Sequence, residues 1–155
     1  MKIIVGSDHH GVKTRLSLED YIRSLGHEVI DVGPPLENTQ PVDYPDVAAE
    51  VAGAVSRGEV DRGVLLCGTG IGMSIVANKF PGVRAAPVVD TLSAELSRRH
   101  NDLNVLCLSG DMLSEETIDR LVEIWLHSEF AGGRHLRRTS KIARIEQEQI
   151  QKNKK

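Results

Sequence analysis

Short apolar runs alternate along this chain with longer segments in which apolar residues recur at helical spacing. This alternation predicts strands that are connected by helices. The short runs are mainly apolar rather than alternating, which indicates strands that are buried on both faces. Five runs carry this pattern, at residues 2–6, 27–32, 63–67, 83–89 and 104–108. We therefore expect an α/β fold with a parallel sheet that is covered by helices on both faces.

Helical spacing predicts six helices, and local residues help to place their ends. Pro45 suits the first turn of a helix, Ser114 is a favoured N-cap, and Gly26 fits the position after a last turn. Pro87, inside the fourth predicted strand, is unfavourable in the interior of a sheet. The expected helices cover residues 8–25, 45–57, 71–79, 91–99, 114–130 and 134 to about 149.

Two segments are expected to lie outside these elements. Residues 33–44 are rich in Pro, Asn and Asp and are expected to form a loop that is mobile or faces a ligand. The last residues are strongly polar and are expected to fray or to lie on a neighbouring molecule. The chain should thus form one domain over residues 1–147, followed by a polar tail over residues 148–155.

Composition narrows the possible functions. The 155 residues include 40% hydrophobic residues, enough for one domain with a sizeable core. A net charge of -3 and an aromatic content of 3% give no basis for binding nucleic acid or a membrane. Cys67 and Cys107 form no C-x-x-C pair, which disfavours a zinc or redox motif. Met1 leads directly into a predicted strand, so we expect a cytoplasmic protein.

Polar side chains gather directly after three of the predicted strands. Ligands of parallel α/β sheets bind beyond the carboxyl ends of the strands, so these groups predict a site at that edge. The groups are Asp8-His9-His10, Cys67-Gly68-Thr69 and Asp90-Thr91.

A thiol followed by three closely spaced glycines is the most specific of these patterns. In Cys67-Gly68-Thr69-Gly70-Ile71-Gly72 a strand ends and a helix begins. Glycines allow a ligand to approach closely, and the amides at a helix start favour negative charge. Anion binding, thiol chemistry and tight helix packing all fit this segment. It matches neither the G-x-G-x-x-G fingerprint nor a P-loop.

Asp8 and residues 98–101 can each be interpreted either as part of a functional site or as residues that only stabilise a helix end. Asp8 either caps the following helix or belongs to the site. Arg98 and Arg99 are typical of a solvated helix C-terminus, whereas His100 and Asn101 offer a proton carrier beside an amide donor.

Arg134 and Arg138 lie four residues apart and share one helix face. Such a pair can bind a phosphate or simply form a basic surface.

Taken in order and spacing, the motifs resemble those of the type B ribose-5-phosphate isomerases, a family that includes the allose- and galactose-phosphate isomerases. The resemblance runs from residue 2 to about residue 147. It rests on Gly6-Ser7-Asp8-His9 with Gly11, Asp43-Tyr44-Pro45, Cys67-Gly68-Thr69-Gly70-Ile71-Gly72, Ala77-Asn78-Lys79, Ser97-Arg98, His100-Asn101-Asp102, Asn104-Val105-Leu106 and Gly132-Gly133-Arg134-His135.

The resemblance implies a Rossmann-like three-layer α/β/α sandwich with a five-stranded parallel sheet. It implies a dimer, or a dimer of dimers, in which two subunits share each active site. The implied reaction interconverts an aldose phosphate and its ketose through a cis-enediolate, without a metal or an organic cofactor.

The resemblance also assigns roles to individual residues. Cys67 matches the catalytic base, and a helix start beside a thiol favours the thiolate. Thr69 and His100 match the pair that opens the sugar ring. The remaining matches are the enediolate donors Gly68, Gly70, Ile71, Gly72 and Asn101, the sugar ligands Asp8 and Tyr44, and the phosphate ligands His9, Arg134 and Arg138, with the arginines expected from the neighbouring subunit.

Two positions, Asp111 and His10, depart from the pattern of many relatives, and Met73 differs from the glutamate of some relatives. Asp111 stands where many relatives carry a phosphate-binding arginine, and a carboxylate there would repel a phosphate. Either Arg137 compensates, or the substrate is longer, or its phosphate is shifted. His10 is often smaller or apolar in relatives, and Met73 stands where some relatives place a glutamate, so this chain is of the cysteine type.

Three functions remain open from the sequence. The first is the interconversion of ribose 5-phosphate and ribulose 5-phosphate. The second is the isomerisation of a hexose 6-phosphate such as allose or galactose 6-phosphate. The third is a sugar-phosphate-binding module without catalysis, which the presence of Cys67, Thr69, His100 and Asn101 argues against.

Overall fold

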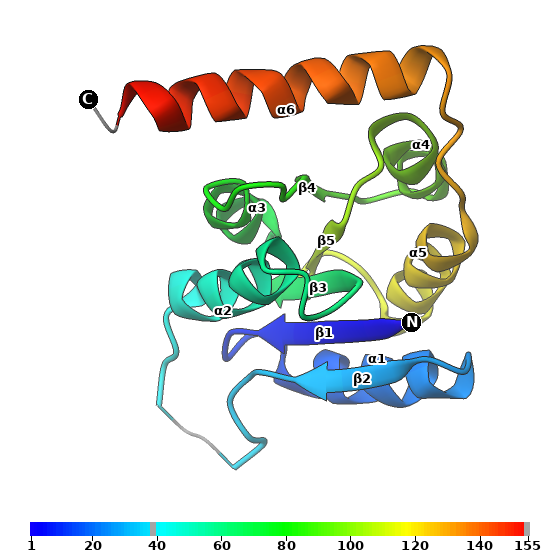
Figure 1. Cartoon of the computed structure of the whole chain (residues 1–155). Coiled ribbons are helices and arrows are strands. Elements are labelled where there is room, and N and C mark those ends of the chain that lie inside the picture. Colours follow the sequence, from blue (N-terminus) through cyan, green and yellow to red (C-terminus); the bar gives the residue numbers. More distant parts are fainter. Residues whose placement is uncertain (38–39, 154–155) are drawn as a thin grey trace.

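The computed structural model describes residues 1–37 and 40–153, which form one parallel sheet and six helices (Figure 1). The sheet has five strands in the order β2-β1-β3-β5-β4, and every neighbouring pair is parallel. This confirms the predicted Rossmann-like α/β fold. The strands are β1 (Lys2–Ser7), β2 (Glu28–Asp31), β3 (Arg62–Cys67), β4 (Ala85–Pro87) and β5 (Val105–Ser109).

The helices cover both faces of the sheet. One apolar core, which includes Leu18 and Trp125, lies under α1, α4 and α5, and a second, which includes Val51 and Met73, lies under α2 and α3. The burial of β1, β3 and β5 on both sides explains why these strands read as apolar runs, whereas the edge strands β2 and β4 are partly exposed. The helices are α1 (Val12–Ser24), α2 (Tyr44–Ser56), α3 (Ile71–Ala77), α4 (Thr91–Asn101), α5 (Glu115–His127) and α6 (Arg134–Lys152).

Several element ends differ from the prediction. Helix α1 begins at Val12 rather than at residue 8, α5 ends at His127 rather than at residue 130, and α4 continues to Asn101 rather than ending at residue 99. Strand β4 has three residues instead of seven and lies at the edge of the sheet, where Pro87 costs no ladder bond to a further strand.

The expected loop and tail are only partly described. Residues 38–39 of the loop and residues 154–155 of the tail lie outside the described residues. The tail is helical as far as Lys152, because α6 continues through it. None of the helices within the described ranges combines the length and apolar character that a membrane crossing requires.

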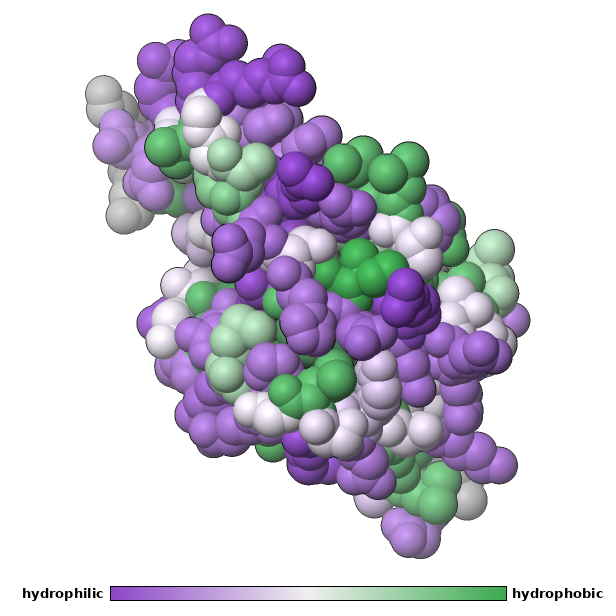
Figure 2. All heavy atoms as spheres, turned by 90° about the vertical axis from the view of Figure 1, so that its right-hand side faces the viewer, coloured by the Kyte–Doolittle hydropathy of each residue, from purple (hydrophilic) through white to green (hydrophobic). Residues whose placement is uncertain are grey.

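Helix α6 lies outside the layers of the sandwich, with its first turns beside α4 (Figure 1). It stands out at the top of Figure 2, where its surface is largely hydrophilic with a small apolar area. A further contact to the body is the hydrogen bond from the Gly82 N–H to Glu146 Oε2, at 2.8 Å. Its apolar side chains Leu136, Ile142 and Ile145 are exposed.

Candidate active site

The carboxyl ends of β1, β3 and β5 bring the first group of predicted residues together. Ser7 pairs with Leu66, and Cys67 pairs with Ser109, so the three strands end at the same level. The Asp8 N–H donates to the Leu66 carbonyl at 3.2 Å, which places Asp8 beside Cys67. We call this the carboxyl-edge cluster; its predicted members are Asp8, His9, Tyr44, Cys67, Gly68, Thr69, Gly70, Ile71 and Gly72.

Cys67 is buried at the end of β3, and its thiol faces the glycine loop. The Gly70 N–H donates to Cys67 Sγ at 3.1 Å, a bond that stabilises negative charge on the sulfur. Gly70 has φ 75°, and a Cβ there would lie 3.2 Å from the Leu108 nitrogen, so only glycine fits. The loop that presents this amide is therefore held closely against β5.

The second cysteine differs from the first. Cys107 is fully buried in the middle of β5, where burial and then the neighbouring Cys67 raise the pKa of its thiol. It stays protonated at neutral pH and serves as a small apolar side chain. Of the two cysteines, Cys67 is the one that lies at the carboxyl edge of the sheet with a hydrogen bond to its sulfur.

Thr69 and Ile71 are exposed on the glycine loop, with the Thr69 hydroxyl accepting the Ile71 N–H at 3.3 Å. Tyr44, in the first turn of α2, lies against Gly72 so closely that a Cβ there would be 2.7 Å from the ring. His9 is exposed, and its Nδ1 accepts the Val42 N–H at 3.2 Å. The loop before α2 and the loops after β1 and β3 therefore converge on one place.

Asp8 does not cap α1, so that interpretation is wrong. The N-cap position is Gly11, and Asp8 Oδ1 instead accepts the His10 N–H at 2.9 Å. Asp8 is 5% exposed and lies at the carboxyl edge of the sheet. Local propensity suggested the cap, but the chain makes a turn over residues 8–11 before the helix begins.

A second group of predicted residues lies at the opposite edge of the sheet. Asn101 ends α4, and its carbonyl accepts the Nε–H of Arg84, the residue just before β4, at 2.9 Å. His100 and Asn101 therefore precede the amino end of β5, whereas Cys67 pairs with the last residue of β5. Four residues of strand separate the two levels, about 13 Å.

Arg134 and His135 from the start of α6 join this group. The His100 and His135 rings stack with centroids 4.1 Å apart and planes 5° apart, and Arg134 Nε donates to His135 Nε2 at 3.3 Å. Burial lowers the pKa of His135, and His100, Arg134, Arg138 and Arg99 lower it further. We call His100, Asn101, Arg134 and Arg138, with His135 among them, the amino-edge cluster.

Arg98 is not solvated, in contrast to the prediction. It is 7% exposed, and its Nη1 donates to the Leu103 carbonyl at 2.6 Å and pairs with Asp102 at 2.8 Å. Arg98 thus fixes the turn between α4 and β5. Arg99 is exposed as expected and pairs with Glu95.

Two residues near the site have no role in the prediction from sequence. Arg15 is fully buried, and its guanidinium donates to Ser7 Oγ at 2.9 Å and to the Pro34 carbonyl at 2.8 Å. It also pairs with Asp31 at 2.9 Å, so it ties the end of β1 to the end of β2 and the start of the loop that leads to α2. His135 was visible in the Gly-Gly-Arg-His motif, but nothing in sequence reveals its stack with His100.

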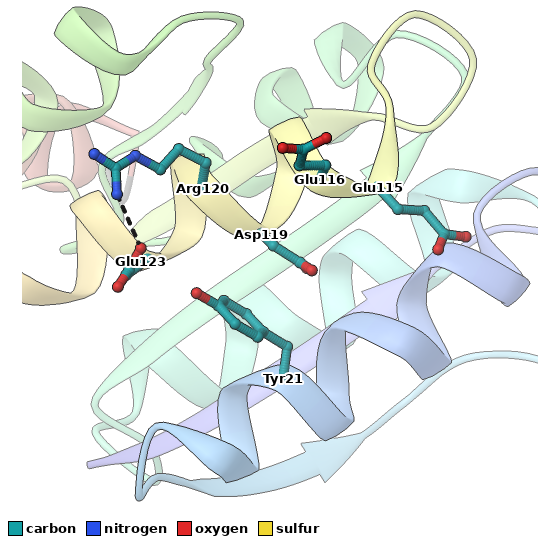
Figure 3. Close-up of a pocket in the computed structure, with 6 residues that line it drawn as sticks. All are labelled: Tyr21, Glu115, Glu116, Asp119, Arg120 and Glu123. Carbon is teal, nitrogen blue, oxygen red and sulfur yellow. Dashed lines mark hydrogen bonds and ion pairs between the residues drawn. The ribbon is translucent and has the colours of Figure 1, made fainter.

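A separate groove of about 650 Å³ lies between α1 and α5. Tyr21 points from α1 toward the acidic face of α5, where Arg120 pairs with Glu123 (Figure 3). Burial, followed by Glu123 and Asp119, raises the pKa of Tyr21. The groove contains none of the predicted site residues, and its carboxylates disfavour a phosphate. Its lining is Tyr21, Glu115, Glu116, Asp119, Arg120 and Glu123.

Neither cluster provides an evident metal site. Among residues 1–37 and 40–153, no three His, Cys, Asp or Glu side chains are grouped so that they could hold a metal ion. The carboxyl-edge cluster instead combines a thiol, backbone amides, a carboxylate and a phenol, which are groups that can move a proton and bind a polyol. The amino-edge cluster combines histidines with arginines, which suits an anion.

Comparison with known proteins places these residues in a family. Residues 3–142 match the family model described as Ribose/Galactose Isomerase. Ribose-5-phosphate isomerase B of Escherichia coli is 44% identical over 146 residues, which cover 94% of this chain and 97% of the relative. D-erythrulose-4-phosphate isomerase of Pectobacterium atrosepticum is 37% identical over 149 residues, with 96% and 97% covered.

A solved structure agrees with the fold over nearly its whole length. The crystal structure of ribose-5-phosphate isomerase B from Mycoplasma genitalium, with bound ribulose-5-phosphate, superposes with a TM-score of 0.90. It is 39% identical, and the match covers 95% of this chain and 97% of the other. The resemblance seen in the motifs is therefore confirmed across the chain.

Proposed function

Because this chain belongs to the ribose/galactose isomerase family and is an aldose-ketose sugar-phosphate isomerase, we propose that it interconverts ribose 5-phosphate and ribulose 5-phosphate with Cys67 as the base. The observation that carries the proposal is the Cys67 thiol at the start of the glycine loop, with a backbone N–H already directed at its sulfur. A binding module has no need of such a thiol.

In this proposal the Cys67 thiolate removes the C2 proton of the open-chain aldose. The electron pair of that C–H bond forms the C1–C2 double bond, and the carbonyl oxygen O1 becomes an oxyanion. The same thiol returns the proton to C1 while the hydroxyl proton of O2 passes to O1, which yields the ketose. Its neighbour Met73 is fully buried and cannot take a proton, so the thiol is the base that this loop offers.

The enediolate between these steps needs hydrogen-bond donors. The amides of Gly68, Gly70, Ile71 and Gly72 follow the thiol directly in sequence, and Asn101 would add a side-chain donor. Removal of one donor from such a site typically lowers the rate by about 10²–10³.

The remaining residues are assigned to ring opening and to binding of the sugar and its phosphate. Thr69 and His100 open the sugar ring, with His100 as acid-base group at the ring oxygen. Asp8 and Tyr44 bind sugar hydroxyls, and His9, Arg134 and Arg138 bind the phosphate. These assignments follow the family motifs at the matching positions.

The two clusters lie at opposite edges of the sheet, so one chain alone does not complete this site. This separation supports a homodimer, or a dimer of dimers, in which His100, Asn101, Arg134 and Arg138 come from the neighbouring copy. The exposed apolar residues of α6 provide a surface for that copy. We place the enzyme in the cytoplasm, since both cysteines are free thiols.

A hexose 6-phosphate is the second candidate substrate, and Asp111 favours it. Its carboxylate stands beside the carboxyl-edge cluster, where it repels the phosphate of a short sugar. The relative that acts on D-erythrulose 4-phosphate supports variation of substrate within this family.

A coupled assay of the purified chain with ribose, ribulose, allose and galactose phosphates tests the proposal. We expect turnover, with the highest kcat/KM for ribose 5-phosphate. A higher kcat/KM for a hexose 6-phosphate would select the second candidate. Binding of these sugars without turnover of any would contradict an isomerase.

A further inference from the structure

His10 and Asp111, which lie on different loops, meet at the carboxyl edge of the sheet. His10 Nδ1 lies 3.6 Å from Asp111 Oδ1, and the two side chains are 51% and 53% exposed. His10 follows β1 and Asp111 follows β5, so the pair joins the loops on either side of β3. These are the two positions at which the sequence departs from many relatives, and the structure places their side chains next to each other.

The Asp111 carboxylate lies directly over Gly68, the residue after Cys67. A Cβ on Gly68 would be 2.8 Å from Asp111 Oδ2, and the Asp111 N–H donates to the Gly68 carbonyl at 3.4 Å. Ser109 Oγ donates to the same carbonyl and accepts the Met112 N–H at 3.0 Å. The carboxylate is therefore held at the loop that carries the base.

His10 is held from its other side. The backbone N–H of His10 donates to Asp8 Oδ1 at 2.9 Å, and the His10 ring lies against the His9 ring, with centroids 4.5 Å apart. His10 thereby connects Asp111 to Asp8, which binds a sugar hydroxyl in the proposed function. The surface over Gly68 thus presents a second oriented carboxylate.

We propose that Asp111, which lies over Gly68 beside His10, determines which sugar phosphates this enzyme prefers. The carboxylate accepts a hydrogen bond from a substrate hydroxyl and excludes a phosphate from the same place. This inference rests on the proposed function, because it assumes that the reacting carbons lie at Cys67. His10 is the positioning residue, and it acts through Asp111.

Chain length gives the direction of the effect. Each additional carbon moves the phosphate of an open-chain sugar farther from the reacting end at Cys67, and hence farther from Gly68 and Asp111. A longer sugar phosphate presents a hydroxyl over Gly68, whereas a shorter one brings its phosphate closer. Asp111 therefore disfavours the shorter substrate relative to the longer one.

The test compares the ratio of kcat/KM for ribose 5-phosphate to kcat/KM for allose 6-phosphate. Asp111→Asn keeps the shape and removes the charge, so this ratio should rise about fourfold, the factor for two unit charges about 5 Å apart in water. His10→Asn should also change the ratio, but not when Asp111→Asn is already present. Glu116→Gln, with the same charge change in the first turn of α5, is the matched control and should leave the ratio within about twofold.

A ratio in Asp111→Asn that equals that of Glu116→Gln would overturn the inference, as would a His10→Asn effect that persists in the double variant. Asp111→Ser serves as a second variant, and thermal melting verifies the fold of each.

The same ratio is measured for the dissociation constants of the two sugar phosphates in a Cys67→Ala background, which binds without turnover. These dissociation constants test the role of Asp111 in substrate preference independently of catalysis. A wild-type chain that turns over neither sugar would count against the proposed function alone.

Discussion

The imidazole of His100 stacks on the imidazole of His135, with ring centroids 4.1 Å apart and planes 5° apart. His100 lies in the last turn of α4 and His135 in the first turn of α6, so the stack joins the two helices. His135 is 7% exposed and receives the Arg134 Nε–H. His135 thus packs directly against the ring that the proposed mechanism assigns to ring opening.

Replacement of His135 should therefore reduce catalysis without removing any group that touches the substrate. We expect His135→Asn to lower kcat about tenfold, because a small displacement of a catalytic ring is costly. His127→Asn, at an exposed histidine on α5, is the control and should leave kcat unchanged. Steady-state kinetics with the preferred sugar phosphate measure this, and an unchanged kcat in His135→Asn would contradict the orienting role.

His135 should also make stability depend on pH. Its pKa in the folded chain lies below the ordinary 6.5, mainly because of burial, so the unfolded chain binds its proton more readily. The stabilisation is present above about pH 6.5 and is lost as the pH falls through the lower pKa of the folded state. Urea unfolding from pH 7.5 to 5 should show a steeper loss for the wild type than for His135→Asn. If the free energy of unfolding fell equally with pH in the wild type and in His135→Asn, His135 would not contribute to the pH dependence of stability.

Arg15 should be critical for stability. Arg15→Met leaves Asp31 and the buried Glu19 without their shared cation and releases the Pro34 carbonyl, which should lower the free energy of unfolding by about 3 kcal/mol. Arg23→Met is the matched control on the same helix; Arg23 also pairs with Glu19 but is half exposed, so about 1 kcal/mol or less is expected. Equal losses in denaturant titrations would refute this ranking.

Cys67 should be needed for turnover and dispensable for binding. Cys67→Ala removes the proposed base and should abolish isomerisation, while the dissociation constant for the sugar phosphate changes little. Cys107→Ala alters the other buried cysteine, in the neighbouring strand, and should keep the activity. Isothermal calorimetry and the coupled assay give the two quantities, and an active Cys67→Ala enzyme would remove Cys67 from the mechanism.

The sequence predicted the layered fold because its evidence is repeated along the whole chain. Five apolar runs and six helical patterns each report burial on a known face. Element ends were less predictable, since a tertiary contact can outweigh a local preference. Asp8 has the chemistry of an N-cap, yet its carboxylate accepts the His10 N–H and the helix starts four residues later. The sequence predicts Arg98 as a surface cation, but in the structure it is buried by its ion pair with Asp102 and its hydrogen bond to the Leu103 carbonyl.

The separation of the site into two clusters was only partly foreseen. The arginines were expected from a neighbouring subunit, but His100 and Asn101 were grouped with Cys67. Topology alone could have corrected this, because a helix that connects parallel strands returns to the amino edge of the sheet. Residues just before β5, such as His100, therefore cannot lie beside Cys67 of the same chain. The His10–Asp111 contact, by contrast, depends on loop conformations that no pattern encodes.

Mixed dimers test the shared site most directly. Cys67→Ala inactivates the carboxyl-edge cluster, and Arg134→Ala weakens the amino-edge cluster, so each variant alone should have little activity. If each site takes one cluster from each copy, a verified mixed dimer contains one site with both clusters intact. Tagged variants that are co-expressed and purified as heterodimers should then recover up to about half of the wild-type kcat per dimer. Heterodimers that remain as inactive as the parent variants would contradict a site completed by the second copy.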